Sequence, residues 1–238
     1  MPGGVEPVEG ACYLRAMPTQ LQGVDVSHHN DPASLPLNVD FMIVRVSFGM
    51  PDGRVLPDLA AEKHLQRLAS VRRDDGRPFL AGYHYLATGE HAASGEAQGE
   101  FFERRRVELS QRFGPLGAAN DTEPLRNKDA QGRAIPWDPV DRVYDRVLGF
   151  NRAMADAGRK YLIYGSREWL ARLKLPWWFA AEVALWAASM PPAPDPWHVA
   201  AIQQLPRPVG GVDRDTFAGS VDELRALFGI EAGTGCVG

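Results

Sequence analysis

The chain has 238 residues, of which 45% are hydrophobic and 24% charged, and its formal net charge is -4. This composition is typical of a globular protein with a sizeable core, and the weak negative charge favours neither nucleic acid nor an anionic membrane as a partner. No apolar run reaches the ~18 residues of a transmembrane helix, so we expect no membrane insertion.

Short apolar or alternating runs predict eight strands, and amphipathic stretches between them predict helices. The strands span residues 23–27, 41–48, 79–86, 117–123, 161–165, 184–188, 199–205 and 211–217. Helices are predicted from Pro57 to the stop at Asp74-Asp75-Gly76, and over residues 92–112, 139–158, 166–173 and 221–228. Helical crossovers imply parallel strands, so we expect an α/β fold in which eight strands close into a single TIM-like barrel.

Four acids would meet at one end of this barrel. Asp121 and Glu123 lie at i and i+2 on one strand, so they share a face with Cα atoms ~7 Å apart. Asp25 lies in the first strand and Asp213 in the last, and these strands are neighbours in a closed barrel. Because clustered carboxylates repel one another, at least one should keep its proton near neutral pH, as a general acid must. Taken alone, an Asp-x-Glu pair is also common on solvated surfaces.

Aromatic side chains accompany these acids. Tyr83 and Tyr85 share one face of the third strand, with His84 on the other, and Tyr164 and Trp186 lie at comparable heights on the fifth and sixth. Such rings can stack on sugars, and plain core packing is the alternative for each of them. His84 is interpreted as a structural histidine.

Several other residues give weaker signals. Leu59 is assigned to the apolar stripe of the first helix, and His64 is expected at the surface. Cys12 and Cys236 are expected as free thiols, with a bridge between the termini as the alternative. No cysteine or histidine spacing indicates a metal site, and no phosphate-binding loop is present, so no cofactor is predicted.

Several stretches, in chain order, together resemble glycoside hydrolase family 25, the Chalaropsis-type lysozymes. The matching segments are Gly23-Val24-Asp25-Val26-Ser27, Phe41 to Ser47, Ala81-Gly82-Tyr83-His84-Tyr85, Asp121-Thr122-Glu123, Leu185-Trp186-Ala187-Ala188 and Val212 to Phe217. Gln203 lies where the family commonly has Trp-Gln-Tyr, whereas Asn120 and Arg45 depart from the family pattern. We therefore assign residues 21–230 to a catalytic barrel, 1–20 to an N-terminal extension and 231–238 to a C-terminal tail.

The resemblance implies a flattened (β/α)5(β)3 barrel that hydrolyses the β-1,4 bond between N-acetylmuramic acid and N-acetylglucosamine in peptidoglycan. It implies that Glu123 is the general acid and that Asp121 assists the substrate's own N-acetyl group, a substrate-assisted route. Asp25 and Asp213 would hold this pair and tune its protonation. The residues that would contact the glycan are Tyr83, Tyr85, Tyr164, Trp186 and Gln203.

The expected partner is the glycan strand of peptidoglycan, and the expected form is a monomer. No signal peptide is visible, which fits a phage endolysin that stays in the host cytoplasm until a holin releases it, or an enzyme exported by another route. Two alternatives stay open: a hydrolase of another N-acetylhexosamine polymer such as chitin, and a catalytically silent glycan-binding barrel.

Overall fold

A computed structural model describes residues 20–70, 79–123, 138–188, 193, 196–197, 200–205 and 211–230. Both cysteines lie outside these residues, so the expectation that they are free thiols stays a prediction. The strands are β1 (Gln20–Val26), β2 (Phe41–Gly49), β3 (Val55–Pro57), β4 (Phe79–Tyr85), β5 (Gly117–Asp121), β6 (Leu162–Gly165), β7 (Ala184–Ala187), β8 (Ile202–Gln204) and β9 (Asp213–Ala218). The helices are η1 (Pro32–Ser34), α1 (Ala61–Ala69), α2 (Gly95–Phe113), α3 (Val140–Asp156), α4 (Arg167–Leu173), α5 (Trp177–Glu182) and α6 (Val221–Leu227).

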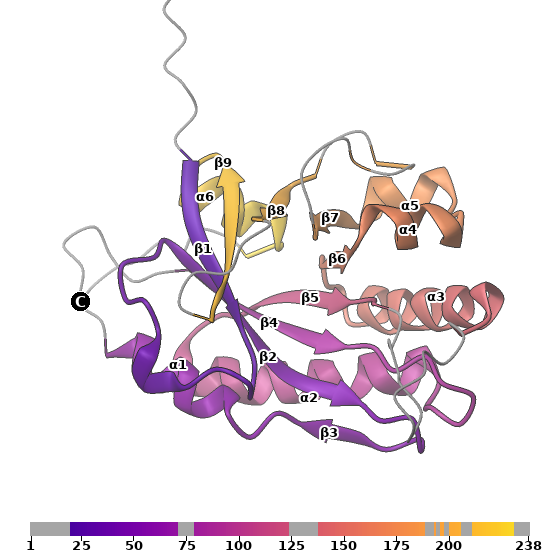
Figure 1. The fold of residues 1–238 in the computed structure, drawn as a ribbon, viewed down its shortest axis with the longest axis horizontal. Helices are drawn as coiled ribbons and strands as arrows, with labels where there is room; N and C mark the ends of the chain where they lie inside the picture. Colours follow the sequence, from indigo (N-terminus) through magenta and orange to yellow (C-terminus); the bar gives the residue numbers. More distant parts are fainter. Residues whose placement is uncertain are drawn as a thin grey trace, which may run out of the picture.

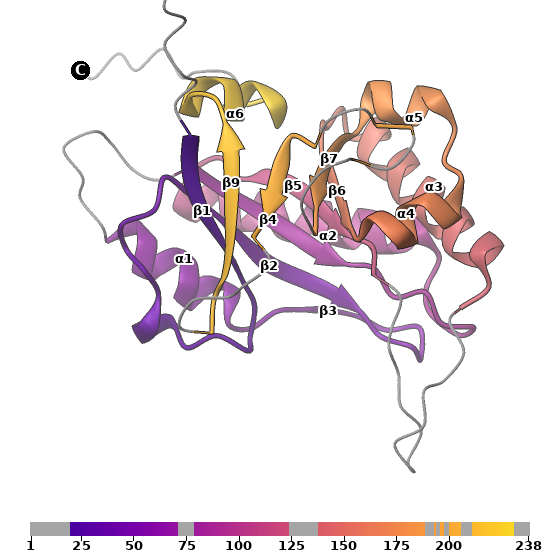
Figure 2. The same cartoon turned by 45° about the horizontal axis from the view of Figure 1, so that its top comes forward.

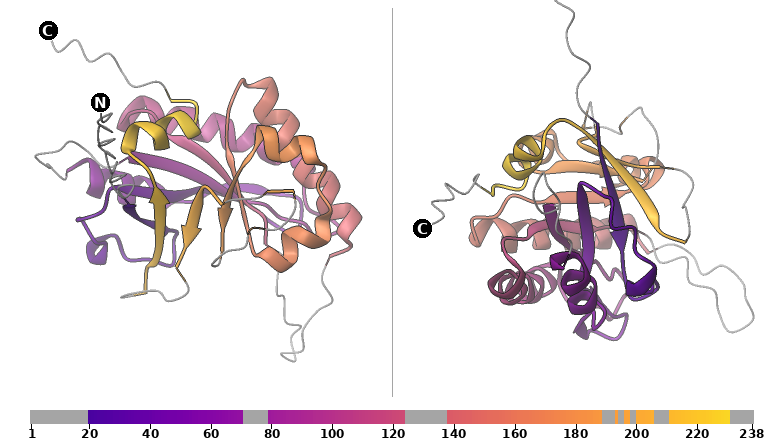
Figure 3. Two further views of the ribbon diagram at one scale, coloured as in Figure 1. Left: turned by 90° about the horizontal axis from the view of Figure 1, so that it is seen from above. Right: turned by 90° about the vertical axis from the view of Figure 1, so that its left-hand side faces the viewer.

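Eight of the described strands close into a barrel, which confirms the predicted fold (Figure 1). Around the ring they follow the order β1, β2, β4, β5, β6, β7, β8 and β9, and β9 pairs with β1 to complete it. The short strand β3, which was not predicted, forms a hairpin with β2 outside the ring. The helices lie on the outside of the strands, as the two views of Figure 3 show.

Not all of the barrel strands are parallel: β9 runs antiparallel to both β8 and β1. The segment from Leu205 to Val212 that joins β8 to β9 is too short for a crossover, which needs about a dozen residues or more. The reversal has a consequence for the acids. Asp213 is the first residue of β9, yet it lies at the same end of the barrel as the carboxyl ends of the parallel strands.

The first helix also differs from its prediction. Pro57 ends β3, and α1 begins only at Ala61. Leu59 is 80% exposed and takes no part in the apolar stripe, whereas the neighbouring Asp58 is buried. The spacing of leucines alone could not show that the chain makes a turn between Pro57 and Ala61.

Strand alternation divides the core into two parts. Outward-facing residues such as Val44 and Ile163 pack against the helices, whereas inward-facing residues fill the barrel. The amino-terminal end of the barrel is closed by phenylalanines: Phe79 and Phe228 have ring centroids 5.1 Å apart, and a Cβ added to Gly23 would lie 2.2 Å from the ring of Phe41. Figure 2 shows α6 across this end. Because this end is filled, the opposite end is where a ligand can enter.

Asn120 is fully buried on the outer face of β5. Neither atom of its amide group makes a hydrogen bond to a described residue, and the same holds for the hydroxyl of Thr122 on the same face. A buried polar group without a partner costs ~1–3 kcal/mol. We expect Asn120→Val to raise the free energy of unfolding by about 1 kcal/mol or more in urea denaturation. Asn120→Asp serves as the comparison and should destabilise; a destabilised valine variant would contradict this account.

Candidate functional site

One row of side chains crosses the inner wall of the barrel at its open end. Tyr85, Asp121, Tyr164 and Trp186 are successive register partners on β4, β5, β6 and β7. Register partners on neighbouring strands point to the same face, so these four side chains lie side by side. The rings of Tyr164 and Trp186 have centroids 4.5 Å apart, and Tyr83 lies edge-on to Trp186 at 5.9 Å. The structure therefore brings the four predicted aromatic residues together around Asp121.

A second group of acids faces this row from β1 and β9. Asp25 and Asp213 are register partners, as expected for neighbouring first and last strands. Asp215, which was not singled out as a site residue, lies two residues further along β9 on the same face and is fully buried. Its Oδ1 accepts a hydrogen bond of 2.8 Å from Nε1 of Trp186, which joins the two groups.

Gln204 makes a further connection between the two groups. The hydroxyl of Tyr164 donates to Oε1 of Gln204 at 2.8 Å, and Nε2 of Gln204 donates to Oδ2 of Asp25 at 3.0 Å. The sequence analysis names Gln203 as the glutamine that contacts the glycan. Successive residues of a strand point to opposite faces, however, so Gln203 and Gln204 cannot both face the acids. Gln203 pairs with Ala187 and Thr216, and its side chain points away from the acids. Gln204 is thus the glutamine of the site.

Glu123 lies two residues beyond the end of β5 and is partly buried. Its negative charge raises the pKa of Asp121, Asp25 and Tyr164, which places its carboxylate near all three. Asp25 also responds to the charge of Asp213. The four acids predicted from the sequence, together with Asp215, therefore share one end of the barrel.

The electrostatics of this cluster favour protonated acids. Burial raises the pKa of Asp121 well above its usual range, and the charges of Glu123 and Asp25 raise it further, whereas Arg45 opposes the shift. Burial also raises the pKa of Asp25 to about 7, although the hydrogen bond from Gln204 works in the opposite direction. This agrees with the expectation that at least one acid keeps its proton near neutral pH. Chemically, such a cluster can both donate and accept protons beside a group of aromatic rings.

The raised pKa values predict a pH dependence of stability. Between the pKa of an unfolded Asp, ~3.9, and its raised pKa in the fold, the folded chain binds more protons than the unfolded chain, so stability falls as pH rises. Asp25, with a folded pKa of about 7, and Asp121, with a pKa well above its usual range, should both act in this direction. We expect the melting temperature to fall by several degrees between pH 6.5 and 9, at ~2–4 °C per kcal/mol, and Asp121→Asn to flatten that slope. Calorimetry across this range checks it, and a flat wild-type profile would contradict it.

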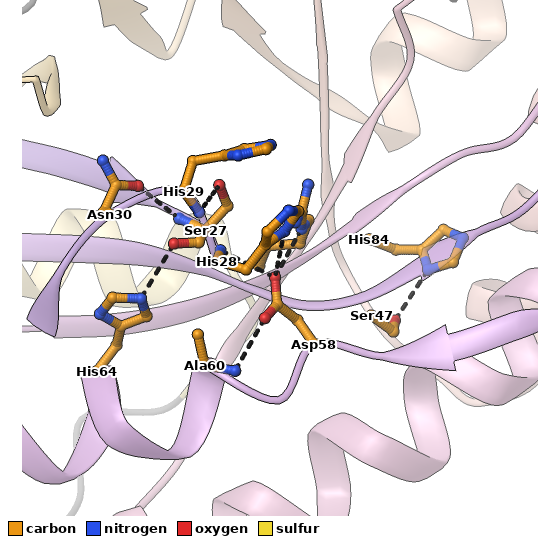
Figure 4. Close-up of polar contacts among 10 residues, drawn as sticks. Ser27, His28, His29, Asn30, Ser47, Asp58, Ala60, His64 and His84 are labelled. Carbon is orange, nitrogen blue, oxygen red and sulfur yellow. Dashed lines mark hydrogen bonds and ion pairs between the residues drawn. The ribbon is translucent and has the colours of Figure 1, made fainter.

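Asp58 organises the rim of the site next to Asp25. Its Oδ2 accepts a 2.8 Å hydrogen bond from Nε of Arg45 and one from the backbone N–H of His28, and its Oδ1 accepts one from the N–H of Ala60 (Figure 4). The Arg45–Asp58 ion pair is buried, with Asp58 only 1% exposed. This carboxylate ties the end of β1, the wall of β2 and the turn before α1 together.

Two histidines near the site are structural. His64 is fully buried, which corrects its predicted surface position, and its Nε2 lies 3.1 Å from the carbonyl oxygen of Ser27. His84 lies between the hydroxyl of Ser47 at 2.8 Å and Oε1 of Gln98 at 3.1 Å, as expected for a structural histidine. Burial lowers the pKa of His84 to about 4, so it is neutral at physiological pH. Figure 4 shows the contact of His64 with Ser27 and that of His84 with Ser47.

A separate groove of about 530 Å³ lies between the start of α2 and α3. Its lining includes Ser94, Glu96, Arg142, Asp145, Arg146 and Arg152. The guanidinium group of Arg146 already donates to the backbone carbonyls of Gly89, Ala92 and Ala93. None of the five clustered acids lines this groove, so the barrel end remains the candidate active site.

No three His, Cys, Asp or Glu side chains among the described residues are grouped so that they could hold a metal ion. None of the helices described here has both the length and the apolar character to cross a membrane.

Comparison with known proteins gave matches at the level of structure. No family model and no curated protein sequence matches this chain. A family 25 glycosyl hydrolase from Bacillus anthracis is similar with a TM-score of 0.61 at 16% identity, over 87% of this chain and 93% of that one. The spore cortex lytic enzyme SleM from Clostridium perfringens is similar with a TM-score of 0.61 at 17% identity, over 86% of this chain and 69% of that one.

The modular autolysin LytC from Streptococcus pneumoniae is also similar, with a TM-score of 0.55 at 19% identity. The match covers 83% of this chain and 46% of LytC, so this chain spans less than half of that protein. At these identities the likeness shows a common fold, and the chemistry has to be argued from the site.

Proposed function

We propose that this chain is a glycoside hydrolase of the family 25 type that cleaves the glycan strands of peptidoglycan. The observation that carries the proposal is the set of carboxyl groups at one barrel end, where Asp121 and Glu123 adjoin Asp25 and Asp213 beside a cluster of aromatic rings. The fold supports it, because the similar structures include a family 25 glycosyl hydrolase and a spore cortex lytic enzyme. LytC, a third, has been solved with a synthetic peptidoglycan ligand.

Glu123 is the proposed general acid. It is more exposed than Asp121 and lies beyond the end of β5, at the open end of the barrel. It gives its proton to the glycosidic oxygen while the bond from that oxygen to the anomeric carbon breaks. The same carboxylate can then take a proton from the incoming water.

Asp121 is the proposed partner of the substrate's acetamido group. Its Oδ1 makes no hydrogen bond to a described residue, so it can accept the N–H of that group. The acetamido oxygen would then bond to the anomeric carbon as the leaving group departs, and water would reopen the ring that forms. This route retains the anomeric configuration, whereas direct attack by water would invert it. Proton NMR of the first-formed products distinguishes the two outcomes.

The remaining residues of the site would bind and orient the sugar. Asp25 and Asp213 are proposed to contact hydroxyl groups and to tune the pair, and Tyr83, Tyr85, Tyr164 and Trp186 to form the aromatic wall of the sugar site, of which Tyr85 is the most exposed. The unit that acts is the barrel of residues 21–230, as a monomer. Release through a holin, as a phage endolysin, is one way in which it would reach the wall.

Purified cell walls test the proposed function. The protein should clear them in a zymogram, and the new reducing ends should be N-acetylmuramic acid. Reducing ends of N-acetylglucosamine would indicate a glucosaminidase instead. Release of oligosaccharides from chitin, without wall clearing, would favour the chitin-type alternative. Binding to walls without release of any fragments would support the alternative of a catalytically silent glycan-binding barrel.

A further inference from the structure

Asp215 is a fully buried carboxyl group with an unusual environment. Its register partners are Gly23 on β1 and Gln204 on β8, so it lies at the centre of the seam that closes the barrel. Its Oδ1 accepts the N–H of Trp186, and its Oδ2 has no donor among the described residues. No lysine or arginine in the described structure forms an ion pair with it.

The neighbour of Asp215 is another acid, Asp25, whose side chain is within hydrogen-bonding reach of it. Asp215 is fully buried and Asp25 partly so. Two such carboxylates in contact cannot readily both be ionised, because water screens their repulsion poorly. One of the two must therefore hold a proton, and that proton can bridge them.

The hydrogen bonds around Gln204 indicate which acid holds the proton. Since Tyr164 donates to Oε1 of Gln204, the amide N–H of Gln204 points to Asp25 and stabilises its anion. Asp215 receives one neutral N–H from Trp186 and no second donor from the residues that the structure describes. Asp25 is therefore the group that carries the negative charge, and Asp215 is the group that keeps the proton.

We propose that Asp215 is a positioning residue that stays protonated and donates a hydrogen bond to Asp25, which holds Asp25 as an oriented anion in the site. The pKa values agree: burial raises the pKa of Asp215 well above its usual range, and the hydrogen bond from Asp215 lowers that of Asp25. The effect on catalysis rests on the proposed function, whereas the protonation of Asp215 does not.

The other titratable groups that face this pair are Asp213 on β9 and Glu123 after β5, whose charges raise the pKa of Asp25, and Tyr164 on β6, whose own pKa is raised by Asp25 and Asp215. All are acids, so none supplies a positive charge that would ionise Asp215. Asparagine at position 215 would imitate the protonated acid, since its carbonyl can accept from Trp186 while its N–H₂ donates to Asp25. Leucine would remove both functions at similar volume.

The first test does not need activity. The infrared difference spectrum of wild type minus Asp215→Asn at pH 8 should contain the carbonyl band of a protonated carboxyl group. Asp215→Asn should also raise the melting temperature by about 3 °C or more at pH 8 but not at pH 4, because only the wild type loses stability as pH rises towards the pKa of Asp215. Asp222→Asn, an exposed carboxylate of α6, is the control and should show neither effect. A difference spectrum without the band would overturn the proposal.

The second test uses hydrolysis of purified walls. Asp215→Asn should keep kcat/KM within about threefold of wild type, whereas Asp215→Leu should lose about tenfold or more, as for a lost hydrogen bond to a charged group. The acid limb of the pH profile should move to higher pH in the leucine variant only, since Asp25 loses a donor. Equal losses in both variants would overturn the positioning role. If the wild type hydrolyses no wall, the proposed function fails, and the infrared and melting experiments still decide the state of Asp215.

Discussion

Replacement of Glu123 by Gln is expected to reduce kcat for wall hydrolysis by about 10²- to 10⁴-fold, the range that general acid catalysis contributes. The amide keeps the size of the side chain but has no proton to give to the leaving oxygen. KM and the melting temperature should change little, because Glu123 lies at the open end of the barrel and is only partly buried. The measurement is the initial rate of turbidity loss with purified walls, beside circular dichroism melting curves.

Glu100→Gln provides a matched control for this experiment. Glu100 lies on the exposed surface of α2, and its variant should hydrolyse walls at the wild-type rate. Full activity of Glu123→Gln would rule out the assigned general acid while leaving the fold and the substrate class open. A variant that is inactive and also melts early would indicate a structural role instead.

Among the substitutions predicted here, Asp58→Ala is expected to cause the largest loss of stability. It would leave Arg45 as a buried charge without its 2.8 Å partner and would free the backbone N–H groups of His28 and Ala60. Breaking a buried ion pair by removing one partner costs about 3–5 kcal/mol. The melting temperature should therefore fall by about 6–20 °C, at ~2–4 °C per kcal/mol.

A double variant separates the effect of the unpaired Arg45 charge from the effect of the lost hydrogen bonds to the backbone N–H groups. If the uncompensated charge dominates, Arg45→Met combined with Asp58→Ala should recover part of the lost stability, because an apolar pair has no buried charge to solvate. Urea denaturation of the wild type, both single variants and the double variant completes the thermodynamic cycle. Purely additive effects would show that Asp58 acts through the backbone N–H groups rather than through Arg45.

The sequence predicted the barrel because its strands have clear signals. Continuous apolar runs such as residues 41–48 form strands covered on both faces, and turn residues punctuate them. The direction of β9 was not predictable from periodicity, which is the same for parallel and antiparallel strands. The shortness of the link before β9 was the signal that could have revealed it.

The site was predicted less completely than the fold. Asp121, Glu123, Asp25 and Asp213 follow from strand alternation and barrel closure, and the structure places them together. Asp58 and Asp215 were missed, because nothing in a sequence distinguishes a buried carboxyl group from a solvated one. The distinction depends on long-range partners, Arg45 for one and Trp186 with Asp25 for the other.

Gln203 and Gln204 show why strand register is difficult to assign from the sequence. In two adjacent residues of the same type, a shift of one position exchanges the inner and outer faces of the strand. Apolar neighbours do not resolve the choice, since β8 is only three residues long. The hydrogen bonds to Tyr164 and Asp25 are what identify Gln204.

Closure of the ring by β1 and β9 affects how this protein folds during its synthesis. Gln20 pairs with Ala218, so strands from opposite ends of the chain must meet before the barrel is complete. Such distant contacts slow folding, because the long intervening loop has to be ordered first. During translation, Asp25 would leave the ribosome early and wait for Asp213 and Asp215, which are among the last residues of the barrel to appear. The nascent chain therefore holds no assembled acid cluster until synthesis of the barrel is nearly finished.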